Sequence, residues 1–299
     1  MKYTNKFRLP QAYVNAIVND SYFKGENVDF SITELIDSPR ISQLSQRYQG
    51  EMSVDVVDFF YTFIGNAVHD KLDVSTPESS IIQRRFTATI EGCIISGKSD
   101  NLDLIDVNAY NLNDHKTTSV WSGMLGGGAK TEWVNQLMGY KGLIYLSDPS
   151  IKIKSATITA IYRDWKEGDV KYKSGYPESP IEVFNIPLPS EESCVMYLKN
   201  RVLLHKAARS IEDSTLLPWC TKEEKWERDG KFAVHQKLSS GDGIQKKAYR
   251  LHDTMKDAIK MVEDSNGKME MVHRPSSRVR CEGWCRVKEF CNQYKEESL

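Results

Sequence analysis

Apolar and polar positions along this chain repeat with helical period in some segments and alternate in others. Residues 54–72 (VDVVDFFYTFIGNAVHDKL) carry apolar side chains at helical spacing and predict an amphipathic helix, with His69 at the border of its apolar face. Ahead of it, Ser31 and Glu34 have the spacing of a capping box, and Pro39 is expected to interrupt or end the helix that begins there. Two short helices should therefore precede the longer one.

Short runs of β-branched and apolar residues separated by turn residues fill positions 80–118 and predict the strands of a sheet. A glycine-rich loop over 122–131 leads to a helix whose apolar positions repeat at Trp133, Leu137, Tyr140 and Ile144. Another alternating strand is expected over 151–165 and another helix over 191–213. This order of elements predicts an α/β fold in which a central mixed β-sheet is flanked by helices.

The pattern changes to shorter pieces near Pro218. Strands are expected over 231–237, 246–251 and 268–274, with a helix over 253–263 between the last two. We therefore expect two domains: a main unit over 1–217 with its N-terminal helices, and a small cysteine-bearing α+β module over 218–299.

Bulk composition narrows the classes of protein that this chain can be. The net charge of −1 and a pI near 6.6 give no global basic field, so any surface for DNA must be a local concentration of Lys and Arg. No apolar run approaches the roughly 20 residues that span a bilayer, and the N-terminus lacks the apolar stretch of a signal peptide. A soluble, cytoplasmic protein is expected, in which the 6 cysteines are not a disulfide framework.

Two carboxylates and a lysine stand where a buried strand would carry apolar residues. In the strand that contains Asp114 and Lys116 these two side chains share one face, while His115 points to the other. Asp100 lies at the end of a strand-like run, and the turn between it and Asp114 can bring the two side by side. Two adjacent carboxylates repel each other unless a cation lies between them, and oxygen ligands suit Mg²⁺. An exposed ion pair on a strand edge is the alternative interpretation of Asp114 and Lys116.

Four short motifs in this order resemble those of the PD-(D/E)XK nucleases of the RecB-like branch. "GKSD" and "NDHKTT" match the Gly-x-x-Asp and Asp-x-Lys pair, "QLMGY" resembles Gln-x-x-x-Tyr, and "GNAVHDKLD" is similar to Gly-x-x-x-His. The resemblance implies a restriction-endonuclease-like core and a site that binds Mg²⁺ or Mn²⁺. The implied metal ligands are His69, Asp100, Asp114 and the backbone carbonyl of His115; Lys116 is the implied catalytic lysine, and Gln136 and Tyr140 line the site.

Each of these positions also has a structural interpretation. His69 can be a satisfied histidine at the edge of a helix, and Gln136 and Tyr140 can be a solvated edge and a core aromatic. Asp103 and Asp106 are expected at exposed strand or turn positions, although a shift in strand register would make one of them a ligand. Glu91 and Gln83 are two further candidates that we leave out of the metal site.

Cysteines gather in the C-terminal module. Cys281, Cys285 and Cys291 have C-x3-C-x5-C spacing, and Cys220 lies at the start of the same module. Four thiolates suit a [4Fe-4S] cluster or Zn²⁺. Several RecB-like nucleases hold such a cluster with one N-terminal and three C-terminal cysteines, but here Ser38 stands at the N-terminal place, so Cys220 would have to replace that ligand. Buried free thiols are the alternative, and this is the expectation for Cys93 and Cys194.

The resemblance implies a divalent-metal-dependent deoxyribonuclease, most simply an exonuclease, in DNA recombination, repair or phage DNA processing. A helicase, a recombinase or a single-strand annealing protein is the implied protein partner. Candidate DNA contacts are the basic stretches at 82–86, 126–133, 152–154 and 273–288, with Trp133 or Trp284 available to stack on a base. A DNA-binding accessory protein of the same fold without catalysis is the alternative, although the intact Asp-x-Lys pair argues against it.

Overall fold

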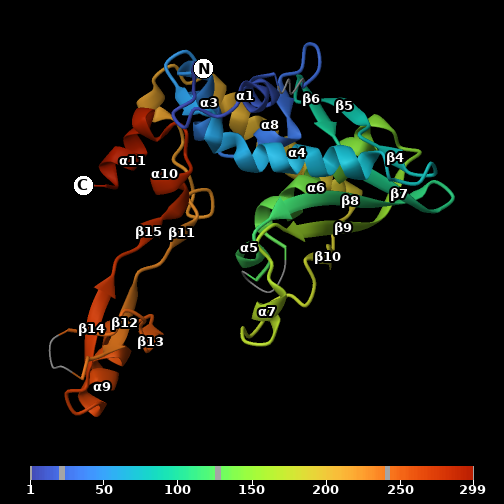
Figure 1. The fold of residues 1–299 in the computed structure, drawn as a ribbon. Coiled ribbons are helices and arrows are strands. Elements are labelled where there is room, and N and C mark those ends of the chain that lie inside the picture. The colour runs from blue at the N-terminus through green and yellow to red at the C-terminus, as the bar shows by residue number, and fades with distance from the viewer. Residues whose placement is uncertain (1, 20–23, 125–128, 240–242, 299) are drawn as a thin grey trace. The chain divides into compact units, whose positions relative to one another are not determined.

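The computed structural model describes residues 2–19, 24–124, 129–239 and 243–298 (Figure 1). The chain divides into two compact units, Met1–Pro218 and Trp219–Leu299. This boundary lies one residue after the predicted boundary between residues 217 and 218.

The first unit is built on a five-stranded sheet with the order β10-β9-β8-β7-β4 (Figure 1). Strands β8 and β9 are parallel to each other, and the other neighbours in this sheet are antiparallel. The sheet is therefore mixed, and the predicted α/β class is confirmed. Its strands are β4 (Ile81–Ile82), β7 (Asn101–Asp106), β8 (Ala109–Thr118), β9 (Lys152–Tyr162) and β10 (Ile181–Asn185).

A three-stranded sheet with the order β2-β6-β5 adjoins it along the chain, because only two residues separate the end of β6 from the start of β7. Its strands are β2 (Phe30–Ser31), β5 (Arg85–Ile90) and β6 (Cys93–Lys98), and a separate parallel pair consists of β1 (Lys2–Thr4) and β3 (Ser53–Asp55). The helices of this unit are α1 (Gln11–Val18), α2 (Ile32–Ile36), α3 (Pro39–Arg47), α4 (Phe60–Asp73), α5 (Val120–Met124), α6 (Thr131–Ser147), α7 (Glu167–Val170) and α8 (Glu191–Arg209).

Local sequence signals explain where the first helices begin and end. The Ser31 hydroxyl accepts the Glu34 amide, and the Glu34 carboxylate accepts the Ser31 amide, so the predicted capping box is present at α2. Pro39 is the first residue of α3, where its missing N–H leaves no donor unsatisfied. The predicted break between two short helices is therefore confirmed.

The helix predicted over 54–72 is wrong in its first six residues. Residues 53–55 form β3, and Val56–Phe59 form a 3-10 turn (η1) ahead of α4. The Asp55 carboxylate accepts the Val57 amide and also binds Thr4 and Lys6, which holds this segment to β1 instead of extending the helix. Helix α5 was not predicted, and residues 125–128 of the predicted glycine-rich loop lie outside the described residues.

One hydrophobic core lies between the strands and helices α2, α6 and α8. The four periodic positions predicted for α6 are all buried in it: Trp133, Leu137, Tyr140 and Ile144. Glycines allow the close packing of these elements. A Cβ on Gly142 of α6 would lie 2.8 Å from the Cys194 carbonyl oxygen of α8, and a Cβ on Gly97 of β6 would lie 2.7 Å from Ile32 Cγ1 and 3.0 Å from Tyr140.

On the face of β8 and β9 that points away from this core, the side chains are polar. Asn111 and Asn113 of β8 exchange hydrogen bonds with Ser155, Thr157 and Thr159 of β9. Alternation along the strands thus gives the sheet one apolar, buried face and one polar, partly exposed face.

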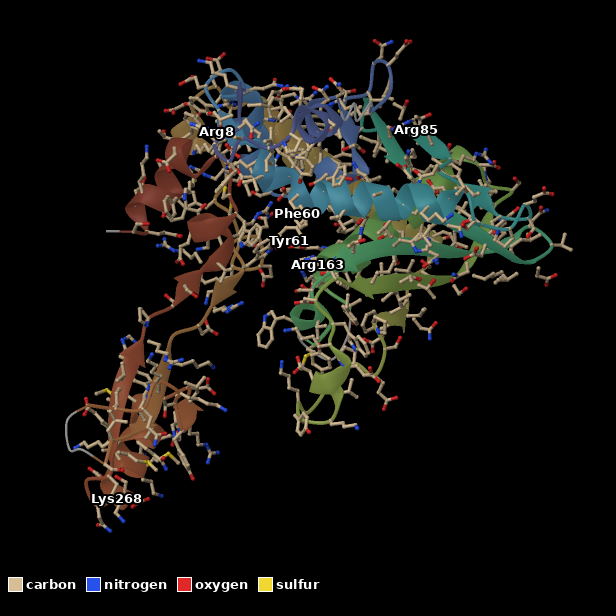
Figure 2. All side chains as sticks on the ribbon, viewed as in Figure 1. Arg8, Phe60, Tyr61, Arg85, Arg163 and Lys268 are labelled. Atoms are coloured by element: carbon tan, nitrogen blue, oxygen red, sulfur yellow. The ribbon has the colours of Figure 1, made fainter. Side chains whose placement is uncertain are left out.

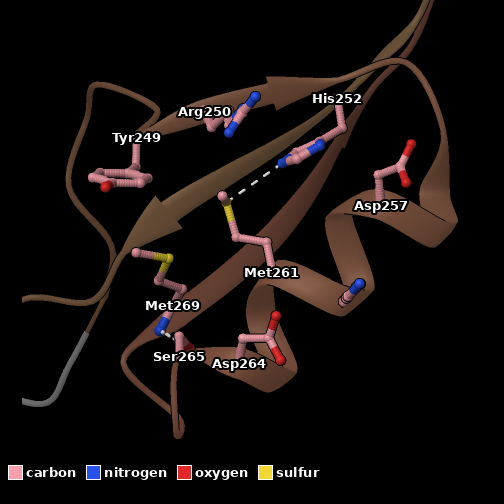
Figure 3. Close-up of a pocket in the computed structure, with 9 residues that line it drawn as sticks. Tyr249, Arg250, His252, Asp257, Met261, Asp264, Ser265 and Met269 are labelled. Carbon is pink, nitrogen blue, oxygen red and sulfur yellow. Dashed lines mark hydrogen bonds between the residues drawn. The ribbon is translucent and has the colours of Figure 1, made fainter.

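The second unit contains a three-stranded antiparallel sheet with the order β13-β12-β14 and helix α9 packed against it. These elements are β12 (Lys231–Gln236), β13 (Arg250–His252), α9 (Met255–Asp264) and β14 (Met269–Arg274). An open groove lies between β13 and α9, where His252 Nε2 is 3.4 Å from Met261 Sδ (Figure 3). The cysteine-bearing part adds β11 (Glu227–Arg228), which pairs with β15 (Ser277–Arg278), and helices α10 (Val279–Gly283) and α11 (Asn292–Glu296).

Within the described residues, no helix has both the length and the apolar character needed to cross a membrane.

Candidate active site

Strand pairing places Asp100 beside Asp114. Residue Asn101 at the start of β7 pairs with Asn113 of β8, so the next position outward on each strand is a carboxylate. The backbone amide of His115 donates a hydrogen bond of 2.9 Å to Asp100 Oδ2. The sheet register therefore fixes both acids at the point where β6 passes into β7.

Asp114 is buried without the hydrogen bonds that a carboxylate normally has. It is 1% exposed, and among the described residues neither of its oxygens accepts a hydrogen bond. Lys116 Nζ lies 2.7 Å from Asp114 Oδ2 in an ion pair, without forming a hydrogen bond to it. A buried carboxylate that is satisfied only by one ammonium group is costly to the fold, and such positions often serve a ligand.

The two acids influence each other. Burial raises the pKa of Asp100 to about 6, and repulsion from the Asp114 carboxylate adds to the rise. The nearby His69, the His115 amide and Lys116 act in the opposite direction on this pKa. Asp100 and Asp114 thus form the kind of acidic pair that a cation between them would stabilise.

Helix α4 brings His69 to the same place. His69 Nδ1 lies 3.6 Å from Asp100 Oδ2, and its ring centroid is 6.0 Å from that of His115. His69 is therefore a neighbour of the acidic pair, as its position in the resemblance implied.

Helix α6 holds the lysine from the other direction. Lys116 Nζ donates a 2.7 Å hydrogen bond to Gln136 Oε1, and Gln136 Nε2 donates one of 3.2 Å to the Tyr140 hydroxyl. The i, i+4 spacing of Gln136 and Tyr140 puts both on one face of α6. The chain from Asp114 through Lys116 and Gln136 to Tyr140 fixes the ammonium group near the carboxylates.

Two carboxylates, an imidazole and nearby backbone carbonyls are donors that suit a hard divalent cation. Both oxygens of the Asp114 carboxylate lack a hydrogen-bond donor among the described residues, so they could serve such an ion. In the part of the chain that the structure describes, however, no three His, Cys, Asp or Glu side chains are arranged about a common point as a metal site. The ligand set of His69, Asp100, Asp114 and His115 therefore stays a prediction.

The other acids near the site have different partners. Asp103 accepts hydrogen bonds from Ser80 and Asn101, and Asp106 is exposed. Glu91 lies in the turn between β5 and β6 and pairs with Lys199 at 2.8 Å. Gln83 donates its backbone amide to the Asp100 carbonyl and its side-chain amide to Asp73. The register thus leaves Asp100 as the acid beside Asp114.

The four cysteines of the second unit come from three nearby segments. The side-chain amide of Gln293, two residues after Cys291, accepts the Cys220 N–H at 2.8 Å and donates to the Cys220 carbonyl at 3.1 Å. Burial raises the pKa of the Cys281 thiol, and nearby Cys285 and Cys291 raise it further. Cys93 and Cys194 are buried free thiols, as expected, at 6% and 0% exposure.

Trp133 is not available for stacking on a base, because it is 7% exposed and packs in the core; Trp284 is 61% exposed. In the basic stretch near β5, Arg84 pairs with Asp148 at 2.8 Å, and Arg85 donates to the Lys24 carbonyl and to Ser96. These arginines have structural partners.

A pair that sequence reasoning missed lies at the opposite end of α4. The guanidinium carbon of Arg163 lies 4.0 Å from the centroid of the Tyr61 ring (Figure 2). Nothing in the local sequence links these two residues, which are about 100 positions apart.

Neither family models nor curated proteins match this chain. Among solved structures, the crystal structure of SSO0001 is similar, with a TM-score of 0.44 and 17% sequence identity over 64% of this chain and 84% of the other.

Proposed function

We propose that this protein is a deoxyribonuclease that uses Mg²⁺ or Mn²⁺ to hydrolyse phosphodiester bonds. One observation supports this proposal above all others: two adjacent acids, Asp100 and Asp114, share a partly buried site with the ammonium group of Lys116. The motifs that resemble those of PD-(D/E)XK nucleases contribute the residues that gather here, which favours a restriction-endonuclease-like core.

In this proposal each side chain has a separate task. Asp100 and Asp114 hold the cation, with His69 and the backbone of His115 beside them. A bound divalent cation would lower the pKa of a water molecule and stabilise the charge that develops on the phosphate. Lys116 places a positive charge next to that phosphate, and Gln136 and Tyr140 keep the ammonium group in position through two hydrogen bonds.

Cleavage assays on linear, circular and single-stranded DNA test this proposal. Hydrolysis is expected with Mg²⁺ or Mn²⁺ and is expected to stop when EDTA removes the cation. Cleavage of linear DNA alone would identify an exonuclease, and cleavage of circular DNA an endonuclease. Binding of DNA with no cleavage under any of these conditions would instead support the accessory protein.

For the second unit we propose that Cys220, Cys281, Cys285 and Cys291 bind a [4Fe-4S] cluster, with Zn²⁺ as the alternative. Two observations support this proposal: nearby Cys285 and Cys291 raise the pKa of the Cys281 thiol, and Gln293 hydrogen-bonds the Cys220 backbone next to the segment of Cys291. In the described residues these thiols are not arranged as a metal site, so a cluster would have to draw them together. A cluster at this position would tie the start of the unit to its last helix.

A further inference from the structure

The first turn of α4 presents two aromatic rings to solvent. Phe60 is 44% and Tyr61 47% exposed, and their ring centroids are 5.3 Å apart (Figure 2). Two neighbouring exposed rings form an apolar patch, and such patches are candidates for binding surfaces.

One cation stacks on these rings, and a second lies near that cation. Arg163 stacks on Tyr61, and Lys130 lies over the ring of Trp133 at 5.4 Å. Within the described residues, neither cation has a carboxylate within ion-pair distance. Burial lowers the pKa of Lys130, and the charge of Arg163 lowers it further against the attraction of Glu132. The two positive groups are therefore close enough to repel each other and would be stabilised by an anion.

These cations lie near the candidate active site. The backbone amide of Arg163 donates to the Thr118 carbonyl at 2.9 Å, and Thr118 follows Lys116 by two residues on β8. Two residues of a strand span about 7 Å. The backbone of Arg163 is therefore held at the end of β8, the strand that carries Asp114 and Lys116.

One stripe of residues along α4 connects the Arg163–Tyr61 contact with the candidate active site. Tyr61, Gly65 and His69 follow each other at intervals of four residues, so they lie along one side of the helix. Tyr61 contacts Arg163 at one end of this stripe, and His69 contacts Asp100 at the other. The stripe is about 12 Å long, the length of three to four stacked nucleotides at about 3.4 Å each.

Gly65 stands at the middle of the stripe without a packing reason. A Cβ at this position would have no atom within 4 Å, in contrast to Gly142 and Gly97. Glycine inside a helix costs about 1 kcal/mol relative to alanine, and close approach of a ligand is one use that offsets this cost.

We infer that the Tyr61–Gly65–His69 stripe of α4 is the track for one strand of nucleic acid. Arg163 and Lys130 bind a phosphate at its far end, Phe60 and Tyr61 provide aromatic surface for the bases, and Gly65 leaves room for the backbone. Cations combined with aromatic rings are typical of surfaces that bind single strands without sequence preference. The inference deepens the proposed nuclease function, because the track leads to the site where that function places cleavage.

Binding of a fluorescent single-stranded DNA oligonucleotide, measured by anisotropy in EDTA, tests the track without cleavage. Arg163→Gln is expected to raise Kd about tenfold, because a charged contact to phosphate is lost. It should also reduce the slope of log Kd against log salt by about 0.7, the value for one phosphate of a single strand. Lys199→Gln is the matched control: Lys199 is an exposed cation that pairs with Glu91 at the end of β6 away from Asp100, and its loss should leave both values unchanged.

Two further variants separate binding from folding. Gly65→Leu should raise the melting temperature, because leucine favours a helix more than glycine does, and yet raise Kd about tenfold by filling the track. Tyr61→Phe should bind like the wild type, since the ring that supports Arg163 is kept, whereas Tyr61→Leu should bind more weakly.

The outcomes distinguish this inference from the proposed nuclease function. Wild-type binding by both Arg163→Gln and Gly65→Leu would overturn the track even if the protein cleaves DNA. No binding by the wild type, or tighter binding of a blunt duplex than of the single strand, would also overturn it. Weakened binding by these variants in a protein that never cleaves DNA would support the track and refute the nuclease.

Discussion

At the scale of single residues, Asp114 shows the conflict between stability and the proposed chemistry. Its carboxylate is 1% exposed and accepts no hydrogen bond from the described residues, so the fold bears the cost of a desolvated charge. Asp114→Asn removes that charge and keeps the shape. We expect this variant to be more stable than the wild type by about 1–3 kcal/mol, measured by thermal or urea unfolding.

Added Mg²⁺ should offset the cost of the buried Asp114 charge and so stabilise the folded protein. A cation that binds only the folded protein raises its melting temperature, so the wild type should be stabilised by Mg²⁺ and Asp114→Asn should not. A less stable Asp114→Asn protein that still responds to Mg²⁺ would mean that Asp114 has a structural role and does not bind the cation.

At the scale of elements, helices α4 and α6 each contain a glycine, but for different reasons. Gly142 of α6 faces the Cys194 carbonyl at a distance that leaves no room for a Cβ, while Gly65 of α4 faces open space. Gly142→Ala should therefore destabilise the protein by about 1–3 kcal/mol, and Gly65→Ala should stabilise it by up to about 1 kcal/mol. Equal effects of the two substitutions on urea unfolding would contradict the packing described between α6 and α8.

The elements also show what could be predicted from sequence. The apolar repeat of α6 and the capping box of α2 depend on neighbours within a few residues, so both were predicted correctly. The start of α4 was not, because Asp55 is held to β1 by Thr4 and Lys6, which lie about 50 positions away. The contact of Arg163 with Tyr61 depends on packing between distant segments in the same way, and no local pattern indicates it.

At the scale of the whole molecule, the proposed nuclease residues and the proposed cluster ligands lie in different units. The site residues His69 to Tyr140 all belong to the first unit, and the four clustered cysteines belong to the second. If the cysteines bind a [4Fe-4S] cluster, protein purified without air should be brown and contain iron, and Cys285→Ser should lose both. Cys194→Ser, which changes a buried thiol of the first unit, should keep them.

Elemental analysis decides between the alternatives for this unit. A colourless protein with one zinc per chain would replace the iron–sulfur assignment by zinc. A protein without metal and with four reactive thiols in the second unit would contradict metal binding by these cysteines altogether.

The proposed function rests on cation-dependent chemistry at Asp100, Asp114 and Lys116. The decisive measurement is the rate of DNA hydrolysis with Mg²⁺ or Mn²⁺, compared among the wild type, Asp114→Ala, Lys116→Ala and the control Lys199→Gln. We expect the wild type and the control to cleave at similar rates, and both site variants to remain folded and lose cleavage. Full cleavage by a folded Asp114→Ala or Lys116→Ala protein would contradict the account.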